Sequence, residues 1–307
     1  METKKRLGKG LEELSHLFMS PATPVGTAAR GKPTVDRLTQ GRPRRFVLLS
    51  NTPGLPVGFW ASTLAAAFAR SGKRTLLIEG HSAPPGIAEM LNLPVIHASL
   101  SEFLGQKEKQ LTLGESEGIR LLAFHVRPDE LRALRAEERD ILLEILRREE
   151  EMSDYLLITL DPEPTDSVEV ELLAVNREAV VIAQAGDPVP VYRLLKALYH
   201  HNPRINVGII VYGVNAEAEA AEMIDRLSAT VKKFLDRSLT FYGIFPPDPI
   251  LPRSLAARAS IFSLGADTEI SRRILSISAE MAQYMGQRAA AEEPGRLMFE
   301  RLHRGKE

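Results

Sequence analysis

The chain has 307 residues, of which 44% are apolar and 26% charged, and its formal net charge is −1. This composition is typical of a globular protein, and the near-neutral charge provides no overall field that favours nucleic acid or acidic lipid. There is no cysteine, which excludes disulfides, thiolate metal sites and a cysteine nucleophile. No run of about 18 apolar residues predicts a membrane span. The basic start lacks the apolar core and cleavage site of a secretory signal.

Composition divides the chain into four segments. Residues 1–19 join a basic start to apolar residues at helical spacing. Residues 20–44 hold four prolines and three glycines, which is typical of a flexible linker. Residues 45–285 alternate short apolar runs with helical stretches, and residues 286–307 are polar. We therefore expect an N-terminal peptide, a linker, one folded domain and a polar tail.

Seven runs in this domain are apolar on both faces, which is typical of buried parallel strands. These predicted strands are 45–50, 74–79, 119–124, 155–160, 179–184, 206–213 and 239–245. Helical periodicity predicts four helices between them, at 59–72, 128–151, 189–201 and 215–237. Such alternation predicts an α/β fold, with a doubly wound, mainly parallel sheet and helices on both of its faces.

Several polar and aromatic residues have a simple structural interpretation. Gly72 suits the C-cap of the first helix. The acidic run at 147–151 is interpreted as a solvated helix end, and Trp60 as a packing residue. His200 and His201 end a predicted helix, where a cationic group suits the helix dipole.

The segment SNTPGLPVG, residues 50–58, lies between the first predicted strand and the first predicted helix. In parallel α/β folds, ligands bind at the carboxyl ends of the strands. A phosphate-binding loop at that place aims backbone N–H groups at the phosphates and adds a lysine and a magnesium-binding hydroxyl. This loop has no lysine. Pro53 and Pro56 each remove an N–H donor.

From this loop onward, the chain resembles the MinD/ParA family of P-loop ATPases, in the SIMIBI class. The family's loop reads roughly SGKGGVGKT and is followed by a helix and GKKVLLID, which aligns without a gap on SGKRTLLIE of this chain. The later stretch YGIFPPDPILPRSLAARASIF resembles the FlhG-type sequence, also called FleN or YlxH. The resemblance implies the MinD/ParA-like fold and favours the FlhG-like branch.

The resemblance also implies which positions of the nucleotide site have changed. The family's dimer-crossing lysine falls on Thr52, its P-loop lysine on Val57 and its magnesium-binding threonine on Gly58, while Gly54 keeps a loop glycine in register. The family's DxD pair of aspartates falls on Glu79 and His81. Its Walker-B-type aspartate falls on Thr159, and its adenine-contacting asparagine falls on Tyr212.

Together these changes predict a pseudo-ATPase. A triphosphate would meet neutral or apolar groups where charge-assisted bonds are needed. We expect no catalytic residue, no metal site and no ATP or magnesium cofactor. His81 is interpreted as a solvated loop histidine rather than a general base. An active ATPase with a rearranged nucleotide site is the alternative hypothesis.

The N-terminal stretch KKRLGKGLEELSHLF resembles the GLGRGLDALL start of ParB proteins, which stimulates ParA-type ATPases. The partner-binding residues that this resemblance implies are Leu7, Gly8, Lys9, Gly10, Leu11, Leu14 and Phe18. A tethered amphipathic helix can dock in a groove of a partner protein, and the implied partner is a ParA/MinD-type ATPase paralogue. A helix docked on its own domain and a helix lying on a membrane surface are the alternatives.

We therefore expect a non-catalytic regulator or scaffold that binds proteins, as a homodimer or heterodimer, and no specific nucleic acid. A ParB-like DNA adaptor is disfavoured by the missing helix-turn-helix pattern. By resemblance to FlhG, the chain would help to position or assemble a polar or cell-surface structure. We expect it in the cytoplasm, at the pole or peripherally on the membrane. The terminal stretch GRLMFERLHRGK is only weakly similar to the membrane-targeting helix of MinD-type proteins.

Overall fold

The computed structural model describes residues 43–79, 86–90, 93, 114–116, 118–123, 134–161, 173 and 176–291, of which 114–116, 123 and 285–291 are described by their backbone alone. Several predicted functional residues lie outside this description: Leu7, Gly8, Lys9, Gly10, Leu11, Leu14, Phe18 and His81. The predictions made for them stay predictions.

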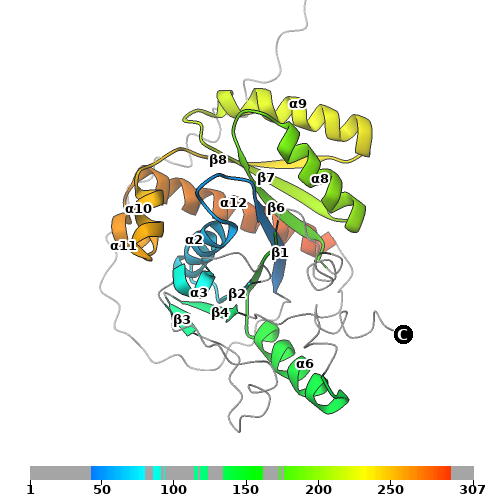
Figure 1. Ribbon diagram of the computed structural model, residues 1–307, viewed down its shortest axis with the longest axis vertical. Coiled ribbons are helices and arrows are strands. Elements are labelled where there is room, and N and C mark those ends of the chain that lie inside the picture. The colour runs from blue at the N-terminus through cyan, green and yellow to red at the C-terminus, as the bar shows by residue number, and fades with distance from the viewer. Residues whose placement is uncertain are drawn as a thin grey trace, which may run out of the picture. The chain divides into compact units, whose positions relative to one another are not determined.

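The described strands form one sheet in the order β3-β4-β2-β5-β1-β6-β7-β8 (Figure 1). Seven strands run parallel, and β3 pairs antiparallel with β4 at one edge. The strands are β1 (Arg44–Ser50), β2 (Thr75–Glu79), β3 (Gly114–Ser116), β4 (Ile119–Ala123), β5 (Tyr155–Thr159), β6 (Glu178–Gln184), β7 (Asn206–Tyr212) and β8 (Leu239–Phe245). The seven predicted strands are confirmed. The sequence missed β3, because three residues are too few for an alternating pattern.

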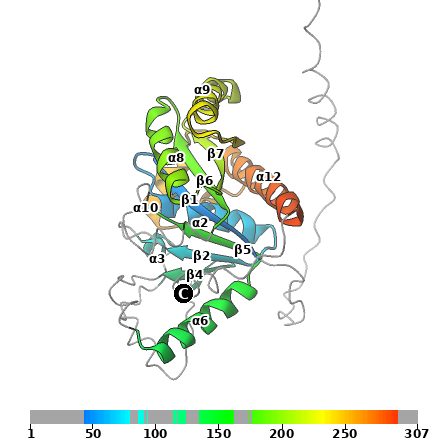
Figure 2. The same cartoon turned by 90° about the vertical axis from the view of Figure 1, so that its right-hand side faces the viewer.

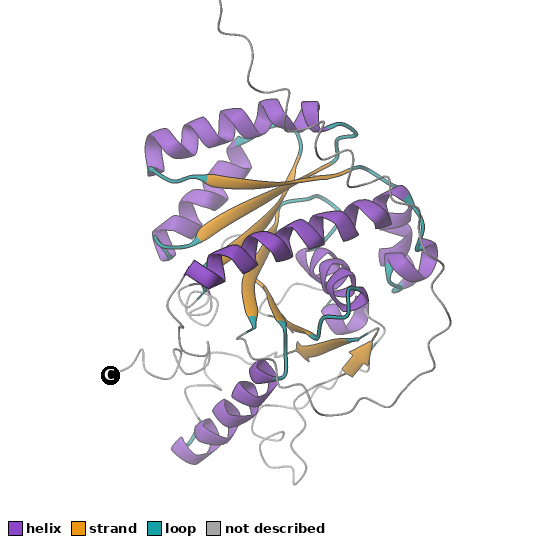
Figure 3. Ribbon diagram, turned by 180° about the vertical axis from the view of Figure 1, so that it is seen from behind, coloured by secondary structure: helices purple, strands orange, loops and turns teal. Residues whose placement is uncertain are grey.

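Helices cover both faces of this sheet, as Figures 2 and 3 show from two sides. One hydrophobic core holds side chains from α6, α8 and α9, and the other holds side chains from α2, α3, α10, α11 and α12. The helices are α2 (Val57–Arg70), α3 (Ile87–Met90), α6 (Ala136–Glu151), α8 (Val189–His201), α9 (Glu217–Leu235), α10 (Ile250–Ala257), α11 (Ile261–Gly265) and α12 (Glu269–Ala291). The predicted doubly wound α/β architecture is confirmed.

The sequence did not predict α3, α10, α11 or α12. In α10, Pro252 lies in the first turn, where the backbone N–H groups have no partner within the helix and a proline therefore costs little. In the sequence, the same proline indicates the end of a helix, so α10 was not predicted. The last helix, α12, continues to Ala291 and thus runs beyond residue 285, where composition placed the end of the domain. At the first helix, Gly72 has φ +75° directly after the C-cap, as expected for a C-capping glycine.

The centre of the sheet is β1, which has β5 on one side and β6 on the other. The chain first winds from β1 toward β2 and β4 and later crosses to β6, β7 and β8. The carboxyl end of β1 is therefore the topological switch point, where ligands bind in open α/β sheets. The loop between β1 and α2 lies at this point.

The acidic end of α6 packs against the amino ends of the strands. Glu150 is fully buried, and its Oε1 atom lies 3.1 Å from the Arg45 guanidinium. Glu149 is 7% exposed and pairs with Arg120. The interpretation of this run as a solvated helix end is therefore wrong for both residues, because arginines at the starts of β1 and β4 provide partners that the local sequence does not reveal. Among the three glutamates, only Glu151 is exposed.

Candidate functional site

The loop of residues 51–56 links β1 to α2 at the switch point of the sheet. Gly54 has φ +75°, a left-handed conformation that side chains rarely adopt, so this position favours glycine. Pro56 is the N-cap of α2 and accepts hydrogen bonds from the backbone N–H groups of Phe59 and Trp60 through its carbonyl oxygen. As a proline, it contributes no N–H of its own to the start of the helix.

A network of hydrogen bonds around Thr52 closes this loop on itself. The Thr52 hydroxyl donates to the Leu55 carbonyl oxygen at 2.9 Å. It accepts from the indole Nε1–H of Trp60 at 2.8 Å and lies 2.8 Å from the Ser50 hydroxyl. The Thr52 backbone N–H donates to Ser50 Oγ at 3.2 Å. Thr52 is only 8% exposed, so its hydroxyl serves the interior of the loop rather than a ligand above it.

Trp60 is a fully buried residue in the first turn of α2 and connects the loop to the carboxyl ends of β7 and β8. Its ring stacks on Phe245, at the end of β8, with centroids 5.2 Å apart and an interplanar angle of 14°. It packs edge-on against Tyr212, at the end of β7, also at 5.2 Å. The interpretation of Trp60 as a packing residue is confirmed. Its hydrogen bond to Thr52 and its stacking on Phe245 were not predicted, because nothing in the local sequence connects these residues.

The loop is also tied to its neighbouring strand through Asn51. Its backbone N–H donates to the Ile182 carbonyl oxygen at 3.2 Å, and its side-chain Oδ1 accepts from the Gln184 backbone N–H at 3.0 Å. The amide of Asn51 thus extends the pairing of β1 with β6 by one residue. The backbone at the start of the loop is held in place by the sheet itself.

The start of α2 carries no charge toward this site. Val57 occupies the position that the resemblance assigns to the P-loop lysine, and it is 7% exposed within the core that α2 shares with the sheet. Gly58, at the magnesium-threonine position, is also buried. No charged side chain occurs anywhere in residues 46–69. A bound anion would therefore find no cation on β1 after Arg45, on the loop or on α2 before Arg70.

Glu79 and Thr159 lie side by side at the carboxyl ends of β2 and β5, where they are register partners. Both are buried. The Glu79 carboxylate accepts a 2.7 Å hydrogen bond from the backbone N–H of Ile87, and a Cβ atom added to Gly86 would lie 3.2 Å from its Oε1 atom. Thr159 Oγ1 lies 3.4 Å from the Ile78 carbonyl oxygen. Glu79 thus holds the start of α3, as a carboxylate at a helix N-terminus does.

Tyr212 lies in the part of the site that the resemblance assigns to adenine. Burial raises the pKa of its hydroxyl above the ordinary value of 10, and the nearby Asp248 carboxylate adds to this effect. Thr52 and Gly54 thus lie in the loop and Val57 and Gly58 in the first turn of α2. Trp60, in the same turn, joins Tyr212 to Thr52. Glu79 and Thr159 form a separate pair on the other side of β1.

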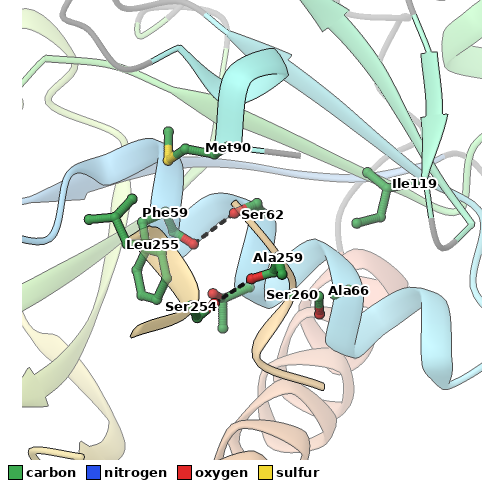
Figure 4. Close-up of a pocket in the computed structure, with 10 residues that line it drawn as sticks. Phe59, Ser62, Ala66, Met90, Ile119, Ser254, Leu255, Ala259 and Ser260 are labelled. Carbon is green, nitrogen blue, oxygen red and sulfur yellow. Dashed lines mark hydrogen bonds between the residues drawn. The ribbon is translucent and has the colours of Figure 1, made fainter. Parts of the chain in front are cut away.

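A small pocket lies away from this loop, between α2, α3, β4, α10 and the segment that follows α10 (Figure 4). Its volume is about 20 Å³, enough for one water molecule. The hydroxyls of Ser62 and Ser254, which line it, already donate to the carbonyl oxygens of Phe59 and Ala259. The pocket is too small for a nucleotide and does not touch the loop of residues 51–56.

A metal site and a membrane span each require features that the described residues do not provide. In this part of the chain, no three histidine or carboxylate side chains gather into a group that could hold a metal ion. None of the helices described here combines the length and the apolarity needed to cross a lipid bilayer. His200 and His201 lie in the last turn of α8, as predicted.

No protein-family model matches the chain, and no curated protein matches it in sequence. Solved structures do resemble it. MinD with Mg-ADP from Pyrococcus horikoshii has a TM-score of 0.57 at 12% identity, over 79% of this chain and 98% of that protein. A ParA family ATPase from Chlorobium tepidum has 0.55 at 19%, over 77% and 98%. The MinC:MinD cell division complex of Aquifex aeolicus has 0.54 at 17%, over 83% and 98%.

These likenesses define the class of the fold. The protein has the α/β fold of the MinD/ParA-type P-loop ATPases, and nearly the whole length of each of these structures is matched. The predicted fold is thus confirmed.

Proposed function

We propose that this chain is a non-catalytic regulator or scaffold of the MinD/ParA type, in the FlhG-like branch, which acts by binding proteins. The observation that carries this proposal is the closed loop between β1 and α2. Its central hydroxyl, Thr52, is bonded to Ser50, Leu55 and Trp60 of the same chain. The position of the P-loop lysine is a valine in the hydrophobic core.

The energetics of phosphate binding support the proposal. A triphosphate is held by backbone N–H groups, by a lysine and by a magnesium ion with its hydroxyl ligand. Here Pro53 and Pro56 have no N–H, and the 24 residues from Phe46 to Ala69 contain no charged side chain. Desolvating several phosphate charges without charge-assisted hydrogen bonds is strongly unfavourable. The alternative is an active ATPase with a rearranged nucleotide site. A measurement of nucleotide binding distinguishes it from the pseudo-ATPase.

The proposed partner is an active ATPase of the same fold. Residues 1–19 resemble the ParB activator, and about 25 residues link them to the domain. A random coil of that length has a root-mean-square reach of roughly 25–30 Å. In the Aquifex aeolicus structure, the resembling fold is part of a complex between MinC and MinD. By analogy, we infer that this chain binds a protein partner during the positioning or assembly of a polar or cell-surface structure.

Nucleotide binding tests the non-catalytic part of the proposal. Trp60 is the only tryptophan of the chain and lies directly beneath the loop, so its fluorescence reports on any ligand that enters this site. We expect neither heat of binding in calorimetry nor a change in Trp60 emission when ATP and magnesium are added. An active MinD-type ATPase is the positive control. Tight magnesium-dependent binding would refute the pseudo-ATPase.

The partner part of the proposal is tested with a synthetic peptide of residues 1–19. We expect it to stimulate the steady-state ATPase activity of a ParA/MinD-type paralogue from the same genome. Lys9→Ala should lower the stimulation more than the binding, since the ammonium group is proposed to stabilise developing negative charge. Leu14→Asp should lower the binding itself, since Leu14 is proposed to anchor the helix in an apolar groove. If no paralogue responds and the peptide instead protects its own domain from proteolysis, self-docking is the correct account.

A further inference from the structure

Trp60 connects three segments that are distant in the sequence. Its Nε1–H bonds to Thr52 in the loop after β1, its ring face stacks on Phe245 at the end of β8, and it packs against Tyr212 at the end of β7. In the sheet order, β6 lies between β1 and β7, and β8 lies at the edge. One side chain therefore joins the carboxyl ends of three strands across part of the sheet.

Backbone hydrogen bonds connect neighbouring strands near the same carboxyl ends. The Gly213 N–H, directly after β7, donates to the carbonyl oxygen of Phe245, the last residue of β8, at 3.0 Å. The Asn51 N–H, directly after β1, donates to the carbonyl oxygen of Ile182 in β6. Gly213 has φ +99°, and an added Cβ atom there would lie 2.6 Å from the Gln184 side-chain nitrogen, so these loops are closely packed. Contacts within the chain therefore connect the carboxyl ends of β1, β6, β7 and β8.

We propose that Trp60 is a built-in lock, which holds the β1–α2 loop against β7 and β8 in one nucleotide-independent conformation. A ligand shifts a conformational equilibrium only as far as its affinities for the two states differ. Here the chain's own groups make the contacts among these loops, so nucleotide has no second state to select. This inference rests on the proposed function: the lock keeps the protein in the conformation that binds its partner, whether or not nucleotide is present.

The chain offers a matched pair of variants for this lock. Trp60 and Phe68 are both buried aromatic residues of α2, but Phe68 stacks on Tyr155 at 4.3 Å and touches neither the loop nor β8 in this network. Replacement of either by leucine removes one buried aromatic ring from the same helix. Any general loss of packing is therefore common to both variants, whereas loss of the lock is specific to Trp60→Leu.

Hydrogen exchange measures the lock directly. We expect the amides of Asn51, Thr52 and Gly213 to exchange about 100-fold faster in Trp60→Leu than in the wild type, relative to amides of α9, which packs in the other hydrophobic core. In Phe68→Leu, the same relative rates should change by less than about threefold. Equal acceleration in both variants would overturn the lock. It would leave the proposed function in place, because the closed loop and the absence of charged side chains from residues 46–69 do not require that Trp60 fixes the loop dynamically.

A second pair of variants keeps the test valid if Trp60→Leu does not fold. Thr52→Val removes the acceptor of the indole N–H with little change in volume, and Thr63→Val makes the same replacement at a buried threonine in α2. We expect the loop amides to exchange about tenfold faster in Thr52→Val only. Unchanged exchange in Thr52→Val would overturn the lock.

Addition of ATP and magnesium to the wild-type protein separates the two proposals. We expect the exchange of Asn51, Thr52 and Gly213 to stay the same, which supports the lock. Slower exchange with nucleotide would overturn both the lock as a nucleotide-independent state and the pseudo-ATPase. Unchanged exchange with nucleotide, together with equal acceleration in Trp60→Leu and Phe68→Leu, would overturn the lock alone.

Discussion

The two ends of the central strands are built from opposite chemistry. At the amino ends, Arg44, Arg45, Arg74 and Arg120 each have a defined partner within the fold. At the carboxyl end of β1, where a nucleotide site needs positive charge, the loop of residues 51–56 is closed by hydroxyl groups and aromatic rings.

This difference shows what each end does for the protein. Arg45, Arg74 and Arg120 pair with carboxylates, and Arg44 donates a hydrogen bond to the Tyr155 hydroxyl. These contacts hold the end of α6 and the starts of the strands, so the arginines contribute to the architecture. The carboxyl end holds its loop with neutral groups, which stabilise one conformation without attracting an anion. The fold of the MinD/ParA-type ATPases is present, and in the proposed pseudo-ATPase internal contacts take the place of the groups that would bind phosphate.

The largest expected effect is at the amino end, in Glu150→Ala. Removal of this fully buried carboxylate takes from Arg45 its partner on α6, and breaking a buried ion pair costs about 3–5 kcal/mol. We expect the free energy of unfolding, measured in urea, to fall by this amount. The control is Glu144→Ala on the same helix, whose pair with Arg147 is exposed and should matter little. Similar losses in both variants would show that the amino end is not held by buried charge.

At the carboxyl end, Val57→Lys should destabilise the fold without creating an enzyme. A lysine at this buried position must lose its charge or pull α2 open, at a cost of about 2–4 kcal/mol. Hydrolysis of ATP should stay at background in a phosphate-release assay, since Gly58 and Thr159 still lack the groups that act with the lysine. Val189→Lys, at a valine 49% exposed in α8, is the matched control and should be tolerated. Clear ATP turnover by Val57→Lys would show that the carboxyl end of β1 lacks only one cation, which contradicts the proposed loss of the whole site.

A smaller effect is expected for Asp154→Asn at the amino end. Burial raises the pKa of this carboxyl, but hydrogen bonds from the Arg74 guanidinium and backbone N–H outweigh it, so the pKa is lowered from 3.8. The ionised form is thus favoured in the folded state, and its contribution is complete above pH 3.8 and is lost as the pH falls toward the lowered pKa. We expect the variant to be about 1–2 kcal/mol less stable at neutral pH.

The pH dependence separates this charge effect from simple loss of packing. The difference in unfolding free energy between the wild type and Asp154→Asn should be constant well above pH 3.8 and should shrink as the pH falls further. A difference that does not change with pH would mean that the carboxylate charge is not what stabilises this end.

The last prediction is that nucleotide has no effect on the self-association of the protein. Thr52 stands at the position that the resemblance assigns to a dimer-crossing lysine, and it is buried and bonded within its own loop. Sedimentation in the absence and presence of ATP and magnesium should therefore give the same distribution of species. A shift from monomer to dimer on addition of ATP would contradict the neutral character of the carboxyl end.

Local patterns in the sequence were sufficient for the seven parallel strands and for the main helices between them. An apolar run such as that of β6 (Glu178–Gln184) is buried in almost any arrangement of this chain, so its type follows from composition and length. The missing lysine and the two prolines of the loop are likewise visible without a structure. The short β3, α3 and α11 were missed because their patterns are too brief, and α10 was missed because it contains a proline. The helix α12 was missed as well, although it has 23 residues.

Only the tertiary structure decided which distant groups meet. The burial of Glu149 and Glu150 depends on arginines of β1 and β4, and the role of Trp60 depends on Phe245 at the end of β8. A sequence pattern indicates that burial of an apolar side chain or pairing of a charge is favourable, because these preferences belong to the residue itself. Which partner it finds is decided by the order of the strands in the sheet, because that order brings together residues from remote parts of the chain.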